Sequence, residues 1–306
     1  MSKNSNFEHS LEQHIKATNV SCRSMAVTLF GDCVSQHGGW IWLGSLIEAL
    51  APFGFNERSV RTAVYRLVQS EWLEVKKIGR KSYYCFTESA KSHYERAARR
   101  IYVSEPPDWN GKWLLVLPVS IPEEKKEEFR KILLWQGFNT LTNGVYAHPS
   151  SDRRSLDETL IEQKLSKDVA IFSATTDDLY SQAVIKGLVN EKWDIAELQQ
   201  FYQNFLDFYR VLKDRIDLEA LTAKEGFMLR TVLLHDYRRI QLRDPDLPSE
   251  ILPNGWVGYE AQDLLKRMYK TLMYPSLDYV EHQLFNAHGT LPSASTKFFS
   301  RFGGLT

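Results

Sequence analysis

Residues 53–86 read FGFNERSVRTAVYRLVQSEWLEVKKIGRKSYYCF, and this pattern predicts a helix followed directly by a basic β-hairpin. Asn56 is a favourable N-cap residue, and the apolar residues between Val60 and Val68 recur at helical spacing, so one helix face should be buried. Two short strands are expected around Gly79-Arg80-Lys81, where glycine suits the turn and the cations lie at its tip. A polar helix beside a basic hairpin is typical of a winged helix-turn-helix that reads DNA.

The exposed side of this segment carries the candidate DNA contacts. Long cations and hydrogen-bonding side chains there suit phosphates and the base edges of a major groove. We predict DNA contacts from Arg58, Arg61, Thr62, Tyr65, Arg66, Lys76, Lys77, Arg80 and Lys81.

A cationic helix can instead be only a solvated face, but two features favour the DNA interpretation. Residues 42–50 predict a short apolar helix that ends at Pro52 and Gly54, which is the leading helix that the motif requires. Residues 56–103 hold 11 Lys and Arg against 5 Asp and Glu, although the whole chain has a formal net charge of zero. The positive charge is therefore concentrated at the motif.

Length and composition place the chain among ordinary globular proteins. Its 306 residues are 43% hydrophobic and 25% charged, which suits two or three domains. No apolar run approaches the roughly 18 residues that span a bilayer, and the N-terminal residues lack the apolar core of a secretory signal, so we expect a cytoplasmic protein without a membrane partner. Cys22, Cys33 and Cys85 lie far apart in no metal-binding pattern, so neither a disulfide framework nor a metal site is predicted.

The order of predicted elements indicates an α+β multidomain chain with an N-terminal winged helix-turn-helix, a middle ferredoxin-like β-α-β-β-α-β domain and a C-terminal, mainly helical domain. We predict the following ranges: a flexible tail over 1–20, the winged helix and its connecting helix over 21–103, a Pro/Gly-containing linker over 104–111, the ferredoxin-like domain over 112–177, and a helical effector-binding and dimerisation domain over 178–306.

A ferredoxin-like domain can also serve a metal-dependent nuclease. Such a nuclease places a carboxylate at the end of its first strand, whereas this strand ends in Leu117-Pro118-Val119, which offers Mg²⁺ no ligand. Packing or dimerisation is therefore the preferred interpretation of the domain, and the nuclease is the disfavoured alternative.

Motifs in three separate parts of the chain resemble one known family. They are GDCVSQHGGWIWLGSLIEAL (31–50), FNERSVRTAVYRL (55–67), LEVKKIGRKSYYCFT (73–87), WNGKWLLVL (109–117), HDYRRIQLRDPDLPSEILPNGWVG (235–258) and SRFGGL (300–305). Together they resemble the PaaX family of repressors of the phenylacetic acid degradation operon. The resemblance implies a homodimeric bacterial repressor that binds double-stranded operator DNA and is released by phenylacetyl-coenzyme A, with no other cofactor.

A coenzyme A thioester needs cations for its phosphates and an apolar or aromatic slot for its phenyl group. The C-terminal part of the chain offers cations on one helix and the next, with a tryptophan in the proline-rich connection between them. As effector-binding candidates we predict Tyr237, Arg238, Arg239, Arg243, Trp256, Lys266 and Arg267, with Arg239 and Arg243 on one helix face. The alternative is that Arg238 and Arg239 simply pair with Asp244 or Asp246 across the loop.

Two other functions compete with an effector-controlled repressor. An enzyme is disfavoured because the chain contains no GxSxG, HExxH, P-loop or dinucleotide-binding motif, and no catalytic residue is predicted. Neighbours such as His235-Asp236 point about 100° apart on a helix and do not form a dyad. The second alternative is a winged-helix DNA-binding protein without a small-molecule effector.

Overall fold

The computed structural model describes residues 7–103, 109–149 and 153–305. The first six residues of the predicted tail, and residues 104–108 of the predicted linker, lie outside the described residues. The chain forms two units, one comprising Met1–Ser104, Phe205–Arg238 and Glu260–Thr306, and the other Glu105–Asn204 and Arg239–Tyr259. Within the described ranges, no helix has the length and apolarity that crossing a bilayer would require.

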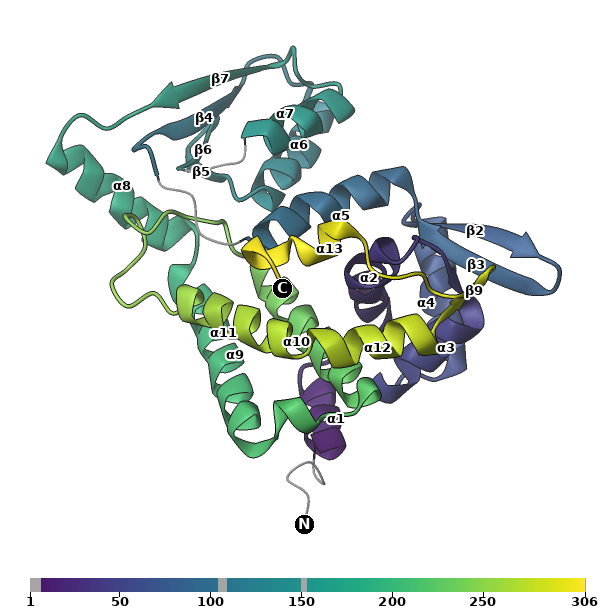
Figure 1. The fold of residues 1–306 in the computed structure, drawn as a ribbon. Coiled ribbons are helices and arrows are strands. Elements are labelled where there is room, and N and C mark those ends of the chain that lie inside the picture. The colour runs from purple at the N-terminus through teal and green to yellow at the C-terminus, as the bar shows by residue number, and fades with distance from the viewer. Residues whose placement is uncertain (1–6, 104–108, 150–152, 306) are drawn as a thin grey trace. The chain divides into compact units, whose positions relative to one another are not determined.

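The predicted winged helix-turn-helix is confirmed in the first unit (Figure 1). Its elements are α2 (Cys22–Asp32), η1 (Val34–Gln36), β1 (Ile41–Trp42), α3 (Leu43–Leu50), η2 (Ala51–Phe53), α4 (Glu57–Gln69), β2 (Leu73–Ile78), β3 (Lys81–Phe86) and α5 (Glu88–Ile101). The three strands form an antiparallel sheet in the order β1-β3-β2. The apolar leading helix is α3, whose Leu46, Ala49 and Leu50 are fully buried.

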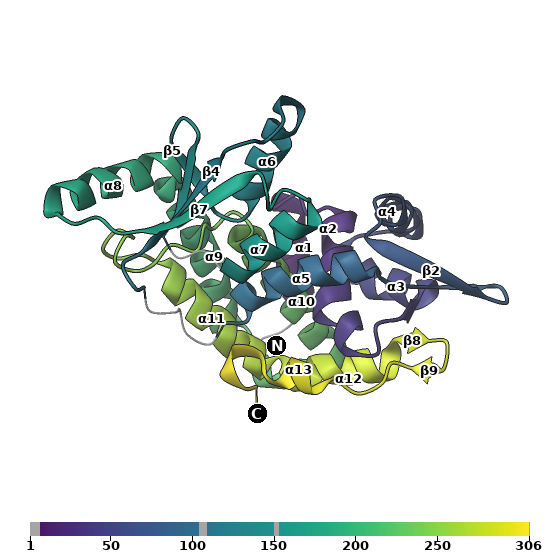
Figure 2. The same cartoon turned by 90° about the horizontal axis from the view of Figure 1, so that it is seen from above.

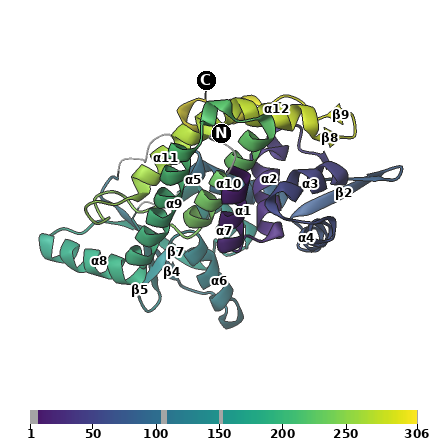
Figure 3. The same ribbon diagram turned by 90° about the horizontal axis from the view of Figure 1, so that it is seen from below.

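Helix α1 (Phe7–Ala17) occupies most of the segment that was predicted to be a flexible tail. The structure differs there because Phe7, Leu11 and Ile15 recur every four residues and are buried. Figure 3 shows α1 beside α9 and α10, and the His14 Nε2 atom lies 2.5 Å from the Asp236 carboxylate of α10. The sequence around this apolar stripe is polar, and the helices that bury the stripe lie about two hundred residues later in the chain. Local sequence therefore does not indicate that α1 is packed.

The C-terminal part is mainly helical, as predicted. Its elements are α9 (Ile195–Arg215), η3 (Leu218–Ala220), α10 (Ala223–Gln241), α11 (Gly258–Thr271), α12 (Met273–Gln283), β8 (Phe285–Asn286), β9 (Gly289–Thr290), α13 (Thr296–Phe299) and η4 (Arg301–Gly303). Strands β8 and β9 form a small antiparallel ribbon. Helices α9, α10 and α11 each contribute residues to both units.

A buried ionic cluster ties α2 to the C-terminal elements of the first unit. The carboxylate of Asp32 lies 3.0 Å from Arg230 Nη2 and 2.7 Å from Arg301 Nη1, and all three side chains are almost fully buried. The hydroxyls of Tyr102 and Tyr269 donate hydrogen bonds to Asp32 Oδ1 at 2.7 and 2.6 Å. Burial alone would raise the pKa of Asp32, but the two guanidinium groups outweigh it and lower that pKa to about 2.

The predicted ferredoxin-like domain is confirmed in the second unit, with β4 (Trp113–Pro118), α6 (Glu123–Trp135), β5 (Asn139–Thr142), β6 (Val145–His148), α7 (Arg153–Glu162) and β7 (Val169–Ala174). All neighbouring strands are antiparallel, in the order β5-β6-β4-β7. Helices α6 and α7 cover one sheet face (Figure 1), where Phe129 and Leu133 of α6 and Leu156 and Leu160 of α7 pack on Val116.

The other sheet face packs against α8 (Leu179–Lys192) and the proline-rich segment before α11. Strand alternation points Trp113 and Leu115 to this side, where they meet Val189 of α8 and Leu247 and Ile251 of the segment. The proline-rich connection between the two C-terminal helices therefore lies on the middle domain.

Candidate DNA interface and effector residues

Helix α4 separates an apolar face from a polar one. The Asn56 side chain caps its first turn by accepting a hydrogen bond from the backbone N–H of Ser59 at 2.9 Å. The buried face consists of Val60, Ala63, Val64 and Leu67. All five predicted contacts on the helix are exposed, namely Arg58, Arg61, Thr62, Tyr65 and Arg66. The helix thus offers an uninterrupted polar surface next to the wing.

Two of these side chains already have partners on their own helix. Arg61 Nη2 lies 2.7 Å from the Glu57 carboxylate one turn earlier. The Thr62 hydroxyl donates to the Arg58 carbonyl oxygen at 2.8 Å. Tyr65 is 65% exposed, which is unusual for so large an aromatic side chain. Because exposed helix ion pairs contribute only a few tenths of a kcal/mol, Arg61 can exchange Glu57 for a base or phosphate at small cost.

The wing is the hairpin formed by β2 and β3. Ile78 pairs with Lys81, so the turn contains only two residues, Gly79 and Arg80. Lys81 was predicted to belong to the turn, but it is the first residue of β3. Gly79 has a φ of +59°, which a two-residue hairpin turn requires and which a residue with a Cβ adopts reluctantly. Arg80 therefore stands alone at the tip.

The wing cations divide between the two faces of the hairpin. Lys76, Lys77, Arg80 and Lys81 are all exposed. Lys76 and Lys77 are consecutive in β2, so their side chains point to opposite faces, and the register puts Lys81 on the face of Lys76. Lys81 Nζ also lies 4.6 Å from the centre of the Trp42 ring, which restrains it near β1. DNA that lies against one face of the hairpin can therefore contact Arg80 together with Lys76 and Lys81. DNA against the other face can contact Arg80 together with Lys77.

Tyr237 and Arg238 are not available to a ligand in this structure, contrary to the prediction. Tyr237 is 2% exposed and its ring packs edge-on against Phe205. Arg238 is 8% exposed, and its Nη1 donates to the Thr28 hydroxyl of α2 at 3.4 Å. Burial lowers the pKa of Arg238. Both residues lie on the side of α10 that faces the core. The helical spacing of the charged residues did not predict that this side is buried.

Arg239, Arg243 and Trp256 belong to the second unit. Helix α10 ends at Gln241, so Arg243 lies beyond the helix. The prediction that Arg239 and Arg243 share one helix face is therefore wrong. The guanidinium of Arg243 lies 4.7 Å from the centre of the Phe201 ring, and Trp256 packs edge-on against Tyr202 with ring centres 5.6 Å apart. Arg243 and Trp256 are therefore held against consecutive residues of α9.

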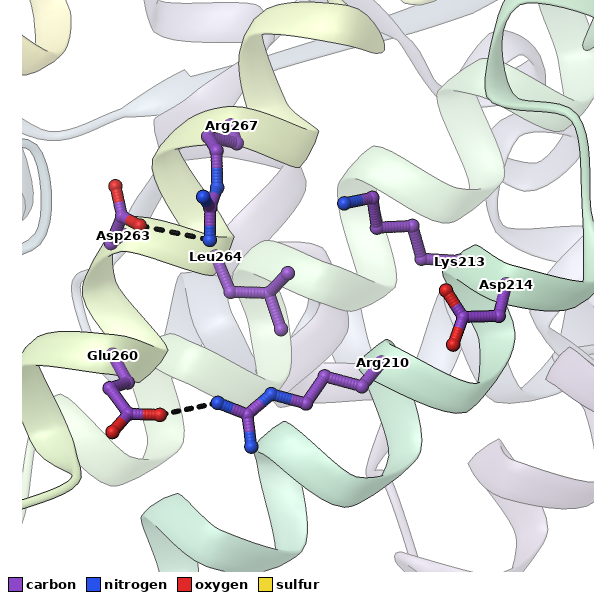
Figure 4. Close-up of a pocket in the computed structure, with 7 residues that line it drawn as sticks. All are labelled: Arg210, Lys213, Asp214, Glu260, Asp263, Leu264 and Arg267. Carbon is purple, nitrogen blue, oxygen red and sulfur yellow. Dashed lines mark hydrogen bonds and ion pairs between the residues drawn. The ribbon is translucent and has the colours of Figure 1, made fainter.

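Lys266 and Arg267 lie on α11 in the first unit, where Arg267 borders a hollow of about 270 Å³ (Figure 4). Its charged lining consists of Arg210, Lys213 and Arg267 with Asp214, Glu260 and Asp263, so cations and carboxylates are equal in number. Arg210 pairs with Glu260, and Arg267 pairs with Asp263 at 2.9 Å. A phosphate would have to displace these carboxylates from the arginines. This hollow is therefore expected to bind anions more weakly than a site whose arginine has no carboxylate partner.

A larger hollow of about 610 Å³ lies between α1 and α9 and was missed by the sequence reasoning, which treated residues 1–20 as a tail. Its lining is mostly apolar, with Phe7 and Ala17 from α1 facing Phe208 and Val211 from α9. The His14 ring stacks on Phe208 with ring centres 3.6 Å apart. In the described part of the chain, no group of three or more His, Cys, Asp or Glu side chains could hold a metal ion.

Comparison with known proteins gives matches along most of the chain. The family models described as PaaX-like protein, PaaX protein central Cas2-like domain, and PaaX-like protein C-terminal domain match residues 21–90, 106–185 and 193–282. The chain is 36% identical over 299 residues to the transcriptional repressor PaaX of Escherichia coli (strain K12), covering 96% of this chain and 94% of that protein. The solved structure of the uncharacterized protein Rv0674 from Mycobacterium tuberculosis is similar in fold, with a TM-score of 0.52 at 21% identity over 83% of this chain and 97% of that one.

Proposed function

This chain belongs to the PaaX family, and from that premise we propose that it is a transcriptional repressor that binds double-stranded operator DNA as a homodimer and is released by phenylacetyl-coenzyme A. The E. coli relative carries the name of a transcriptional repressor, which favours a regulatory role over an enzymatic one. Repression would follow from occupancy of the operator.

The observation that carries the DNA-binding part is the exposed polar face of α4 next to the basic wing. Arg58, Arg61 and Arg66 supply positive charge along one helix, and Arg80 supplies it at the hairpin tip. A helix can enter the major groove and direct such side chains at base edges, while the wing reaches the neighbouring phosphates. In a dimer, two such helices would read half-sites about 34–36 Å apart, one turn of the duplex.

Replacement of Arg61 by alanine is expected to weaken binding to the cognate operator by about 1–3 kcal/mol, and binding to random DNA much less. The physical reason is that a bidentate arginine–guanine contact discriminates between bases. Fluorescence anisotropy titrations on both DNAs at one salt concentration would measure the difference. Arg130→Ala is the matched control, because it removes the same side chain from an exposed helix ion pair of the middle domain, with Glu127. Equal losses on both DNAs would make Arg61 a phosphate contact.

Removal of the tip charge and of the adjacent β3 charge, by Arg80→Ala and Lys81→Ala together, is expected to lower the salt dependence of DNA binding. Each lost phosphate contact reduces the slope of log K against log salt by about 0.9, because one fewer counterion is released. Titrations at several salt concentrations give this slope, with Lys126→Ala/Arg130→Ala as a control of equal charge change on α6. A wing that faces away from DNA would leave the slope of the Arg80→Ala/Lys81→Ala variant unchanged.

The effector part of the proposal rests on the family and on the aromatic and cationic side chains of the second unit. Arg243 over Phe201 pairs a cation with an aromatic face, and Trp256 beside Tyr202 adds a second aromatic pair. Phenylacetyl-coenzyme A offers phosphates for the guanidinium, and its adenine and phenyl rings can stack on aromatic side chains. Of the seven residues predicted from sequence, Arg239, Arg243 and Trp256 are the three that we propose to contact the effector.

A further inference from the structure

Trp42 lies where the leading helix, the sheet and the wing meet. It is the second residue of β1 and the N-cap residue of α3. The register pairs it with Tyr83 of β3, so Lys81, two residues earlier in β3, is its diagonal neighbour on the same sheet face. The ammonium nitrogen of Lys81 lies 4.6 Å from the centre of the half-buried Trp42 ring, within the range of a cation–π contact. A side chain of β1 thus holds a cation of the wing.

The position of the Trp42 ring depends on a glycine two residues later in the chain. A Cβ atom on Gly44 would lie only 2.4–2.6 Å from three atoms of the ring, closer than non-bonded carbon atoms approach each other. The ring therefore lies against the backbone of the first turn of α3, in space that a residue with a side chain would fill. Helix α3 is fixed in the core by its buried Leu46 and Leu50, so the ring gives Lys81 a rigid platform.

The two faces of the wing carry different lysines. Figure 2 shows the wing extending past α3 and α4, so the packing of these helices does not by itself decide which face meets DNA. Lys76 lies opposite Tyr83 in the register and therefore shares a face with Lys81. Lys77 lies opposite Ser82, on the other face. We call the face that carries Lys76 and Lys81 the Trp42 face.

The two lysines of the Trp42 face form a pair that suits a phosphate. They are diagonal neighbours on adjacent strands, about 7–8 Å apart, and both are exposed. Two ammonium groups so close repel each other unless an anion lies between them, and a DNA phosphate is such an anion. Glu74 also lies on this face, but near the base of the hairpin. The outer half of the Trp42 face is therefore better suited to a phosphate than the opposite face, where Lys77 lies opposite a serine.

We propose that Trp42 is a positioning residue that holds Lys81 on the Trp42 face, and that the wing contacts a DNA phosphate through this face with Lys76 and Lys81. The inference rests on the DNA binding of the proposed function and adds the face of the wing that is used. A free lysine loses side-chain entropy when a phosphate fixes it, and a lysine that a ring already restrains loses less. The ammonium group has three N–H donors, so it can contact the ring and still donate to a phosphate.

A double-mutant cycle on the full chain tests the role of Trp42. Trp42→Leu is expected to weaken operator binding about two- to fivefold, the fold-change that corresponds to an exposed cation–π contact. In the Lys81→Ala background the same substitution should change the affinity by less than about 1.5-fold, because the side chain that Trp42 positions is absent. Trp42→Phe keeps an aromatic face and should restore most of the affinity. Fluorescence anisotropy titrations with operator DNA at one salt concentration measure these affinities.

Trp135→Leu is the matched control, because it makes the same change at a tryptophan of α6 that is 46% exposed, and it should leave operator binding unchanged. A loss from Trp42→Leu that is equal with and without the Lys81 side chain would mean that Trp42 only supports the fold, and would overturn the positioning role. An affinity of Trp42→Leu equal to that of the wild type would overturn it as well.

The salt dependence of binding tests the choice of face. Lys76→Ala is expected to reduce the slope of log K against log salt by about 0.9, because one phosphate contact is lost, whereas Lys77→Ala should leave the slope unchanged. The two variants remove the same charge from consecutive positions of β2, so each is the control for the other. A slope lowered by Lys77→Ala would overturn the choice of face. Unchanged slopes in all the wing variants would contradict the wing–DNA contact of the proposed function itself, and Arg61→Ala tests binding through α4 separately.

Discussion

Asp32→Asn is expected to lower the free energy of unfolding by about 3–5 kcal/mol, the largest stability effect that we expect from one substitution. Asparagine keeps the size of the side chain but removes its charge, which leaves Arg230 and Arg301 buried without a carboxylate between them. The tyrosine hydroxyls that donate to Asp32 would also lose an ionised acceptor. Urea denaturation followed by circular dichroism measures the change.

The matched control is Asp263→Asn, which makes the same chemical change in an exposed ion pair with Arg267 on α11. Exposed pairs contribute about 0–1 kcal/mol, so this variant should unfold nearly as the wild type does. Equal stability of the two variants would mean that solvent screens the charges of the Asp32 cluster. This result would contradict the burial of the cluster in the structure.

The same cluster predicts a pH dependence. The pKa of Asp32 is about 2 in the folded protein and about 3.8 when it is unperturbed, so the folded state favours the ionised form. Its contribution, on the order of 2 kcal/mol, is complete above pH 4 and is lost as the pH falls through about 2. Asp32→Asn should lack this part of the acid destabilisation, so the stabilities of variant and wild type should converge as the pH is lowered.

Phenylacetyl-coenzyme A is expected to dissociate the operator complex, whereas free phenylacetate at the same concentration is not. An effector releases DNA only if it binds the DNA-free conformation more tightly, and DNA must then weaken effector binding by the same factor, typically about 5- to 150-fold. Calorimetric titration of the effector into free and DNA-bound protein would test this reciprocity. Equal action of phenylacetate would remove the need for a phosphate-binding group.

Arg243→Ala is expected to weaken effector binding about 10- to 100-fold while leaving operator affinity unchanged, because charge-assisted hydrogen bonds contribute about 1.5–3 kcal/mol each. Arg267→Ala is the informative comparison, since Arg267 was predicted from sequence for the same role but already pairs with Asp263. A larger loss in Arg267→Ala would move the site to the α9–α11 hollow. An unchanged melting temperature of the wild type with the thioester would favour a winged-helix protein without this effector.

The winged helix and the middle domain were predictable from sequence because local patterns specify them. Apolar residues at helical spacing with an N-cap at Asn56 define α4, and a glycine between two basic strands defines the wing. The strand and helix order of the middle domain likewise identified its topology. The exposure of the five predicted contacts on α4 followed from the same periodicity, since the face opposite an apolar stripe is solvated.

The placement of the candidate effector residues and the core of the first unit depended on tertiary structure. Asp32 and Arg301 are 269 residues apart, and no local pattern marks two such residues as partners. Arg238 and Arg239 are neighbours in sequence, yet one is buried against α2 and the other belongs to the second unit. Periodicity states which residues share a helix face. Which face is buried, and where the helix ends, depends on contacts with distant parts of the chain, and these contacts decide which arginines remain available to a ligand.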